Sequence, residues 1–132
     1  MDFLEQMKLY IETNFALFKP TLSVGLLFNT NDICIRPTPS APSEKQLNYD
    51  QCFYYGFQIL VRHKDQLIAY QTCLDLLMGL NVLQNCAVTS GNDSFSFIKN
   101  DVTTPINFVE RDQEGSIYTF LCTSELNLEG VL

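Results

Sequence analysis

The sequence predicts a single α+β domain, residues 1–132, with a mostly antiparallel or mixed β-sheet and two α-helices packed on one face. Three observations predict this class. Apolar residues recur every three or four positions in two stretches, which is typical of amphipathic helices. In several other stretches they alternate with polar residues, which is typical of strands. The strands are grouped apart from the helices, which favours α+β over a regularly alternating fold.

The first element is a predicted helix over residues 2–18. Asp2 followed three residues later by Glu5 resembles a capping box, and Pro20 cannot continue the helix. The apolar residues at four-residue spacing predict one buried stripe: Phe3, Met7, Ile11 and Phe15.

Two short strands and a long loop are expected next. Period-two alternation over residues 22–28 and a second apolar run at 33–36, separated by a polar turn, predict a hairpin. Residues 37–50 then hold three of the five prolines and predict a long exposed loop, because a segment of this kind is usually functional within a compact domain. We expect this loop to contact partners through Pro37, Thr38, Pro39, Pro42, Leu47 and Tyr49.

Residues 52–63 give the clearest strand pattern in the chain. The large apolar residues at alternate positions predict a strand in the middle of the sheet with one face against helices. Asp65 is placed to cap the helix that follows, which runs to about residue 80–83. The expected inner stripe of that helix is Leu67, Tyr70, Leu74, Leu77 and Met78.

The remaining residues predict two hairpin-like units. Strands are expected at 87–90 and 94–99 around the turn at 91–93, and at 106–110 and 116–126 around the turn at 111–115. Gly115 supplies the positive φ that such a turn needs.

Composition excludes several classes of function. Eight Lys and Arg oppose fifteen Asp and Glu, for a net charge of −7, and no basic cluster exists, so tight binding to nucleic acid is not expected. No apolar run reaches the length of a membrane span, and the first residues lack the regions of a signal peptide, so we expect a soluble protein made in the cytosol. The five cysteines have no zinc-site spacing, and we expect them to be free and buried.

No pattern in the sequence identifies a catalytic, cofactor or metal site, and we predict none. The single histidine, His63, with Cys52 or Cys73 as nucleophile, is the one arrangement that would suit a small hydrolase, but a surface histidine is the favoured interpretation. The acids at 110, 112 and 114 lack the order of a calcium loop. Tyr49, Tyr54 and Tyr55 fit an interface and a partly buried sheet equally well.

Four segments, in this order, carry a resemblance to a known family. They are residues 35–39 after the predicted hairpin, 57–65 entering the second helix, 91–99, and 115–119 leading to 124–126. With this order and spacing, nearly the whole chain resembles the minor capsid proteins of tailed bacteriophages that infect Gram-positive hosts. Those proteins are similar to the tail-terminator, or tail-completion, proteins of long-tailed phages.

The resemblance implies a structural virion protein of the tail or neck, assembled in the cytoplasm of the bacterial host. Copies of the chain would form a ring, commonly a hexamer, that caps the tail tube protein and meets the head–tail connector protein. DNA would pass through this ring without tight binding. No catalytic residue is implied, and no cofactor, metal or membrane.

Two expectations add detail to this interpretation, and two other functions stay open. Acidic side chains that line a channel repel phosphates, and Glu110, Asp112 and Glu114 are the candidates; the alternative is that they keep the outer surface soluble. The other functions are a monomeric adaptor that binds a peptide by strand addition and the Cys/His hydrolase.

Overall fold

The computed structural model describes residues 3–19, 21–28, 30–38, 52–83, 88, 96–113 and 115–127. Two helices and five strands form one α+β domain, which confirms the predicted class. In chain order the elements are α1 (Phe3–Asn14), β1 (Ser23–Val24), β2 (Asp32–Pro37), β3 (Cys52–His63), α2 (Gln66–Leu80), β4 (Ser96–Asp112) and β5 (Gly115–Asn127).

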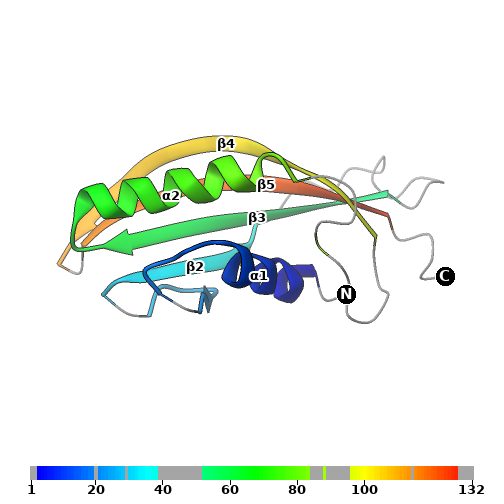
Figure 1. Ribbon diagram of the computed structural model, residues 1–132. Helices are drawn as coiled ribbons and strands as arrows, with labels where there is room; N and C mark the ends of the chain where they lie inside the picture. The colour runs from blue at the N-terminus through cyan, green and yellow to red at the C-terminus, as the bar shows by residue number, and fades with distance from the viewer. Residues whose placement is uncertain are drawn as a thin grey trace.

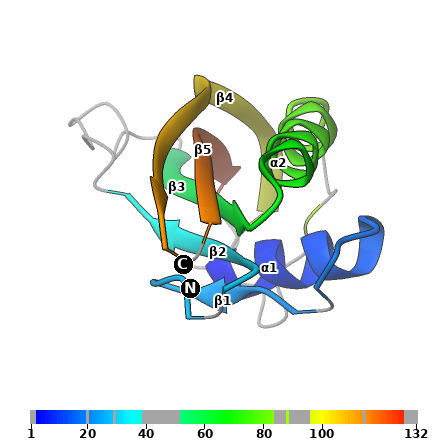
Figure 2. The ribbon, with the colours of Figure 1, turned by 90° about the vertical axis from the view of Figure 1, so that its left-hand side faces the viewer.

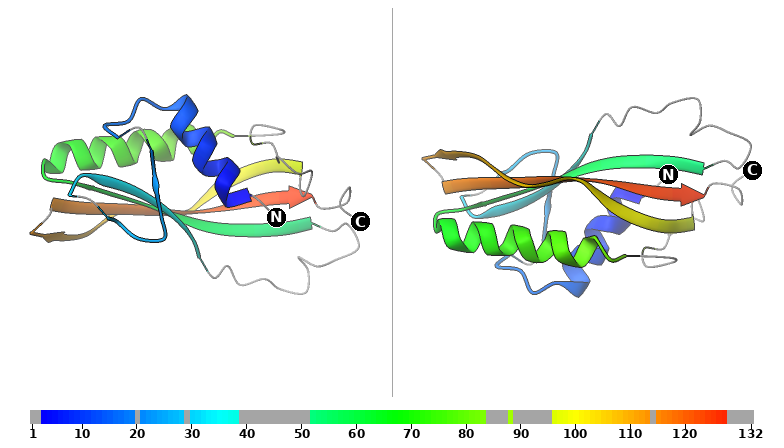
Figure 3. Two further views of the ribbon diagram at one scale, coloured as in Figure 1. Left: turned by 90° about the horizontal axis from the view of Figure 1, so that it is seen from below. Right: turned by 90° about the horizontal axis from the view of Figure 1, so that it is seen from above.

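The five strands form one mixed sheet in the order β1-β2-β3-β5-β4. β1 is parallel to β2, and the other neighbours are antiparallel. β3 lies at the centre, as its alternating pattern predicts, and pairs with β5 along its whole length. Both helices cover the same face of the sheet, as Figures 1 and 3 show.

Helix α1 contributes the predicted stripe to the core, although it ends at Asn14 rather than at residue 18. Phe3, Met7 and Ile11 are fully buried. The ring of Phe3 lies 4.8 Å from that of Tyr55 and 6.0 Å from that of Phe57, centroid to centroid. The N-terminal turn of α1 therefore packs on the middle of β3.

Helix α2 begins as predicted but turns a different face to the sheet. The Asp65 carboxylate accepts a hydrogen bond of 3.0 Å from the Leu67 N–H, which confirms the cap. The predicted inner stripe is mostly wrong, since Leu67, Tyr70 and Met78 are exposed and Leu74 is only half-buried, whereas Leu77 packs partly buried against the core. The residues that face the core are instead Ala69, Cys73, Leu76 and Leu80. Apolar residues surround most of this helix, so their periodicity does not select a face.

The predicted hairpin over 22–28 and 33–36 is also wrong. Only Ser23 and Val24 pair with β2, and they run parallel to it. Gly25, at φ 88°, ends β1, while its N–H donates to the Ile35 carbonyl at 3.1 Å. The chain thus leaves the strand direction immediately after Val24 and cannot form an antiparallel ladder.

β4 is one long strand, where the sequence predicts separate strands at 94–99 and 106–110. It continues past Pro105, which is tolerated because β4 is an edge strand and bulged there. Sixteen residue steps along β4 match twelve along β5, so β4 carries four extra residues. Such bulges bend a strand, and Figure 1 shows β4 as an arch.

Several expectations fall on parts of the chain outside the described residues. These are most of the loop at 37–50, the turn at 91–93, and the strand at 87–90 apart from Val88, which is buried in a bend. Gly115 does adopt a positive φ, 146°, at the start of β5, as predicted. Within the described parts of the chain, no helix combines the length and apolar character that crossing a bilayer requires.

Candidate assembly surfaces

The first candidate surface consists of three exposed apolar side chains on β1 and on the segment that follows it. Val24, Leu26 and Phe28 are 49%, 62% and 66% exposed, and we call them the edge patch. They lie on the segment that the sequence predicts as a strand, at alternate positions. Burial of such side chains stabilises a protein, so their exposure on a short, ordered segment indicates a surface suited to a partner.

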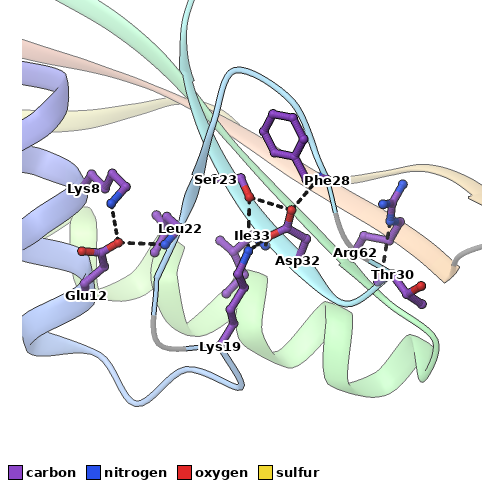
Figure 4. Close-up of polar contacts among 10 residues, drawn as sticks. All are labelled: Lys8, Glu12, Lys19, Leu22, Ser23, Phe28, Thr30, Asp32, Ile33 and Arg62. Carbon is purple, nitrogen blue, oxygen red and sulfur yellow. Dashed lines mark hydrogen bonds and ion pairs between the residues drawn. The ribbon is translucent and has the colours of Figure 1, made fainter.

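A buried carboxylate holds this segment in place. Asp32 is fully buried, and it accepts hydrogen bonds from the Ser23 hydroxyl at 2.7 Å and the Phe28 N–H at 2.7 Å. The Ile33 N–H donates to it at 2.9 Å, and the Lys19 ammonium pairs with it. Figure 4 shows these groups converging on Asp32 from the chain on both sides of the edge patch. These hydrogen bonds and the ion pair with Lys19 offset the cost of burying the Asp32 charge.

A second carboxylate attaches the start of the segment to α1. Glu12 accepts a hydrogen bond of 2.8 Å from the Leu22 N–H and one of 2.7 Å from the Lys8 ammonium (Figure 4). Desolvation by burial acts to raise the pKa of Glu12, but these two hydrogen bonds and the positive charge of Lys8 outweigh it and hold the pKa below its ordinary value. The edge patch is therefore fixed at both ends.

The second candidate surface lies on the outer side of α2. Leu67, Tyr70 and Met78, with Val82 just beyond the helix, are exposed, and Leu67 is 77% exposed. Together with Phe108 of β4, they form what we call the helix patch. Leu67 and Met78 are eleven residues apart and point to the same side, opposite the stripe that faces the sheet.

Aromatic contacts join the helix part of this patch to β4. The Tyr118 ring of β5 lies between two others, 5.5 Å from the ring of Tyr70 and 5.3 Å from that of Phe108, both edge to face. The Tyr118 hydroxyl also accepts a hydrogen bond of 2.9 Å from the Gln66 side chain. Tyr118 thus connects Tyr70 of α2 with Phe108 of β4.

The two patches lie on different parts of the domain: the edge patch is on and just after β1, at one edge of the sheet, and the helix patch is on the outer side of α2, which packs on β3, β5 and β4. β1 is the strand at one edge and β4 the strand at the other. Figures 1 and 2 show the same arrangement from two directions: the chain around β1 lies at one side of the domain, and α2 with β4 at the other. A partner seated on one patch leaves the other accessible.

The loop residues predicted to contact partners are described only in part. Pro37 is the last residue of β2 and pairs with Phe57, and the Thr38 N–H donates to the Gly56 carbonyl at 3.0 Å. These two residues therefore extend the sheet rather than begin a free arm. The other four lie outside the described residues: Pro39, Pro42, Leu47 and Tyr49.

The three predicted channel acids differ from one another. Glu110 is exposed on β4. Asp112 accepts a hydrogen bond of 3.0 Å from the Gly115 N–H and lies 3.5 Å from the Arg62 guanidinium, so it supports the turn between β4 and β5. Glu114 lies outside the described residues. Glu110 is the best placed of the three for a role at the surface.

The thiols and the imidazole are held in separate environments. His63 accepts a hydrogen bond of 2.9 Å at Nδ1 from the Asp65 N–H, and its ring meets that of Phe18 edge to face at 4.8 Å. Cys73 is fully buried in the middle of α2, about 10 Å along the helix axis from its start. Desolvation and the nearby Cys122 raise the pKa of Cys73 to about 12. Cys73 does not fit a nucleophile activated by His63.

The remaining predicted residues have simpler surroundings. Cys34 and Cys122 are also free and buried, as expected, whereas the side chains of Cys52 and Cys86 lie outside the described set. Tyr55 is half-buried against Phe3, and burial raises its pKa. Among the described residues, no three His, Cys, Asp or Glu side chains group to hold a metal ion.

Sequence reasoning missed both patches for identifiable reasons. It assigned Leu67, Tyr70 and Met78 to the core, although the run of apolar residues around α2 exceeds what one buried face needs. That excess is the signal that an exposed apolar face exists. The edge patch carries a weaker signal: Gly25 interrupts the apolar run at 22–28, and a glycine inside a strand pattern often marks a break in regular pairing.

Searches against protein-family models, curated proteins and solved structures found no match to this chain. The two patches and the sequence resemblance described above are therefore the observations that bear on the function of the protein.

Proposed function

We propose that this protein is a structural virion subunit that assembles head to tail with copies of itself into a ring. The observation that carries the proposal is the presence of two different exposed apolar patches, one at the β1 edge of the sheet and one on the outer side of α2. Contacts between unlike surfaces on identical subunits generate a closed ring when the rotation per subunit closes. A single patch would instead favour a two-fold dimer.

The place of the ring follows from the resemblance to phage minor capsid and tail-terminator proteins. The ring, a hexamer in that family, caps the tail tube protein and presents its other side to the head–tail connector protein. It belongs to the tail or neck of the virion and is assembled in the bacterial host cytoplasm. The protein acts by its shape and converts no substrate.

The acidic balance of the chain suits a ring through which DNA passes. The net charge is −7, and residues 67–132 hold eight acidic and two basic side chains. Acids at a channel wall repel phosphates and keep the duplex mobile. Glu110 is the cleanest test, because Asp112 also supports a turn. Glu110→Lys should slow DNA ejection from assembled particles, and an unchanged ejection rate would contradict a lining role.

The peptide-binding adaptor fits the sheet edges less well. Strand addition needs a regular, accessible edge. The β4 edge carries four extra residues and Pro105, which interrupt regular pairing, and β1 is two residues long. The adaptor would be monomeric, so the mass of the purified protein separates the two functions.

Two measurements test the proposal. Sedimentation velocity of the purified protein should show one discrete oligomer, and the fraction of protein in that oligomer should rise with protein concentration. Electron microscopy of phage particles carrying an affinity label on this protein should place the label at the head-proximal end of the tail. A label on the capsid shell, or its absence from particles, would refute the assignment to the tail.

A further inference from the structure

We infer that the edge patch of one copy seats on the helix patch of the next copy, so that these two surfaces form the contact between neighbours in the ring. The inference rests on the proposed head-to-tail assembly and specifies which residues make it. The occupant of each patch is therefore a second copy of this chain.

Charge favours a second copy as the occupant. Two copies that each carry −7 repel one another, and this repulsion is weakest where the contact surfaces themselves carry no charge. Residues 21–28, which carry the edge patch, include no charged side chain. The fifteen residues of α2 include one, Asp75. The edge patch and the α2 part of the helix patch therefore bring almost no like charge together, and the charges nearest Phe108 on β4 are of both signs: Glu110, Arg111 and Asp112.

The dimensions of the two patches also agree. From Leu67 to Met78 the helix patch rises by about 16 Å, at about 1.5 Å per residue. From Val24 to Phe28 the edge patch spans at most about 13 Å, at about 3.3 Å per residue. The edge patch is therefore no longer than the helix patch on which it would seat.

The anchoring of the edge patch lowers the cost of the contact. Asp32 fixes the backbone at Phe28, and the Gly25 N–H is bonded to β2. A segment that is already ordered loses little conformational freedom on binding. Large aromatic side chains in such positions commonly dominate interface energy, which makes Phe28 and Tyr70 the expected main contributors.

Two double variants test the contact, one for each patch. Leu26→Ser with Phe28→Ser removes the edge patch, and Leu67→Ser with Met78→Ser removes the helix patch. All four side chains are exposed, so the fold should be retained, which circular dichroism verifies. Leu9→Ser is the matched control, because Leu9 is an exposed leucine on α1 outside both patches.

Each double variant should raise the dissociation constant for self-association by about 30-fold or more, the effect of losing a central contact residue. The control should assemble like the wild type. Sedimentation is measured with and without 1 M ammonium sulfate, which strengthens apolar association.

Mixing the two double variants gives the decisive result. Each retains the surface that the other lacks, so the mixture should form one-to-one dimers that neither variant forms alone. The inference is overturned if the mixture stays monomeric, if either variant assembles normally, or if the wild type stays monomeric in sulfate. Labelled-particle microscopy decides the tail assignment separately, so each idea can fail without the other.

Discussion

Replacing the buried carboxylate of Asp32 by the methyl group of alanine should cost about 3 kcal/mol of folding free energy. Removing one partner of a buried ion pair typically costs about 3–5 kcal/mol, because the remaining charge keeps its desolvation penalty. The Lys19 side chain is 18% exposed, so it regains part of its hydration, and the lower end of this range applies. The N–H groups of Phe28 and Ile33 also lose their acceptor.

Urea unfolding followed by far-ultraviolet circular dichroism measures this loss, since the chain has six Tyr but no Trp as a fluorescent probe. The expected loss is a large part of the roughly 5–15 kcal/mol that stabilises a typical domain. Asp32→Asn is the isosteric variant. It preserves the size of the side chain, but it also leaves Lys19 without its counter-charge and turns an amide NH2 group toward donors, so it should cost a similar amount.

Hydrogen exchange gives a local measurement of the same prediction. The Gly25 and Phe28 amides should exchange faster in Asp32→Ala than in the wild type, beyond the change at β3 amides. A loss below about 1 kcal/mol, with exchange at Phe28 unchanged, would refute the view that Asp32 holds the edge patch in place.

Three further predictions follow from other parts of the fold. Asn100→Ala should cost about 2 kcal/mol in urea unfolding, because the buried Asn100 amide donates to the Leu80 carbonyl at 2.9 Å; a loss under about 0.5 kcal/mol would contradict this. Gly115→Ala should lower the thermal midpoint by several degrees, since its new Cβ would lie 2.4 Å from a backbone oxygen, and an unchanged midpoint would count against it. Glu12→Gln should lower the free energy of unfolding by under about 1 kcal/mol at neutral pH. The stabilisation by the Glu12 carboxylate is present above the ordinary pKa of a glutamate and is lost as the pH falls through the lower pKa of the folded protein. Wild type and Glu12→Gln should thus differ in urea midpoint at pH 7 and converge in acid, and a constant difference would contradict this pKa shift.

Features determined by short stretches of the chain could be predicted from the sequence alone. The stripe of α1, the cap of α2 at Asp65 and the central position of β3 all follow from residues within one element. Each of these features has one strongly favoured arrangement, because a single face of the element is apolar or a single side chain can accept hydrogen bonds from the free N–H groups. The same is true of the positive φ of Gly115 in its tight turn.

Only the tertiary structure decided the features that depend on a choice between similar surfaces. Several faces of α2 are apolar, and the shape of the sheet decided that Ala69 and Cys73 are buried while Leu67 is exposed. The contacts of Asp32 with Lys19 and with the Phe28 N–H hold the segment after β1 at the edge of the sheet, where the sequence predicts a strand of a hairpin. Both candidate surfaces arise in this way. Burial is a property of the assembled domain, so the apolar residues left outside are identified only after the core is filled.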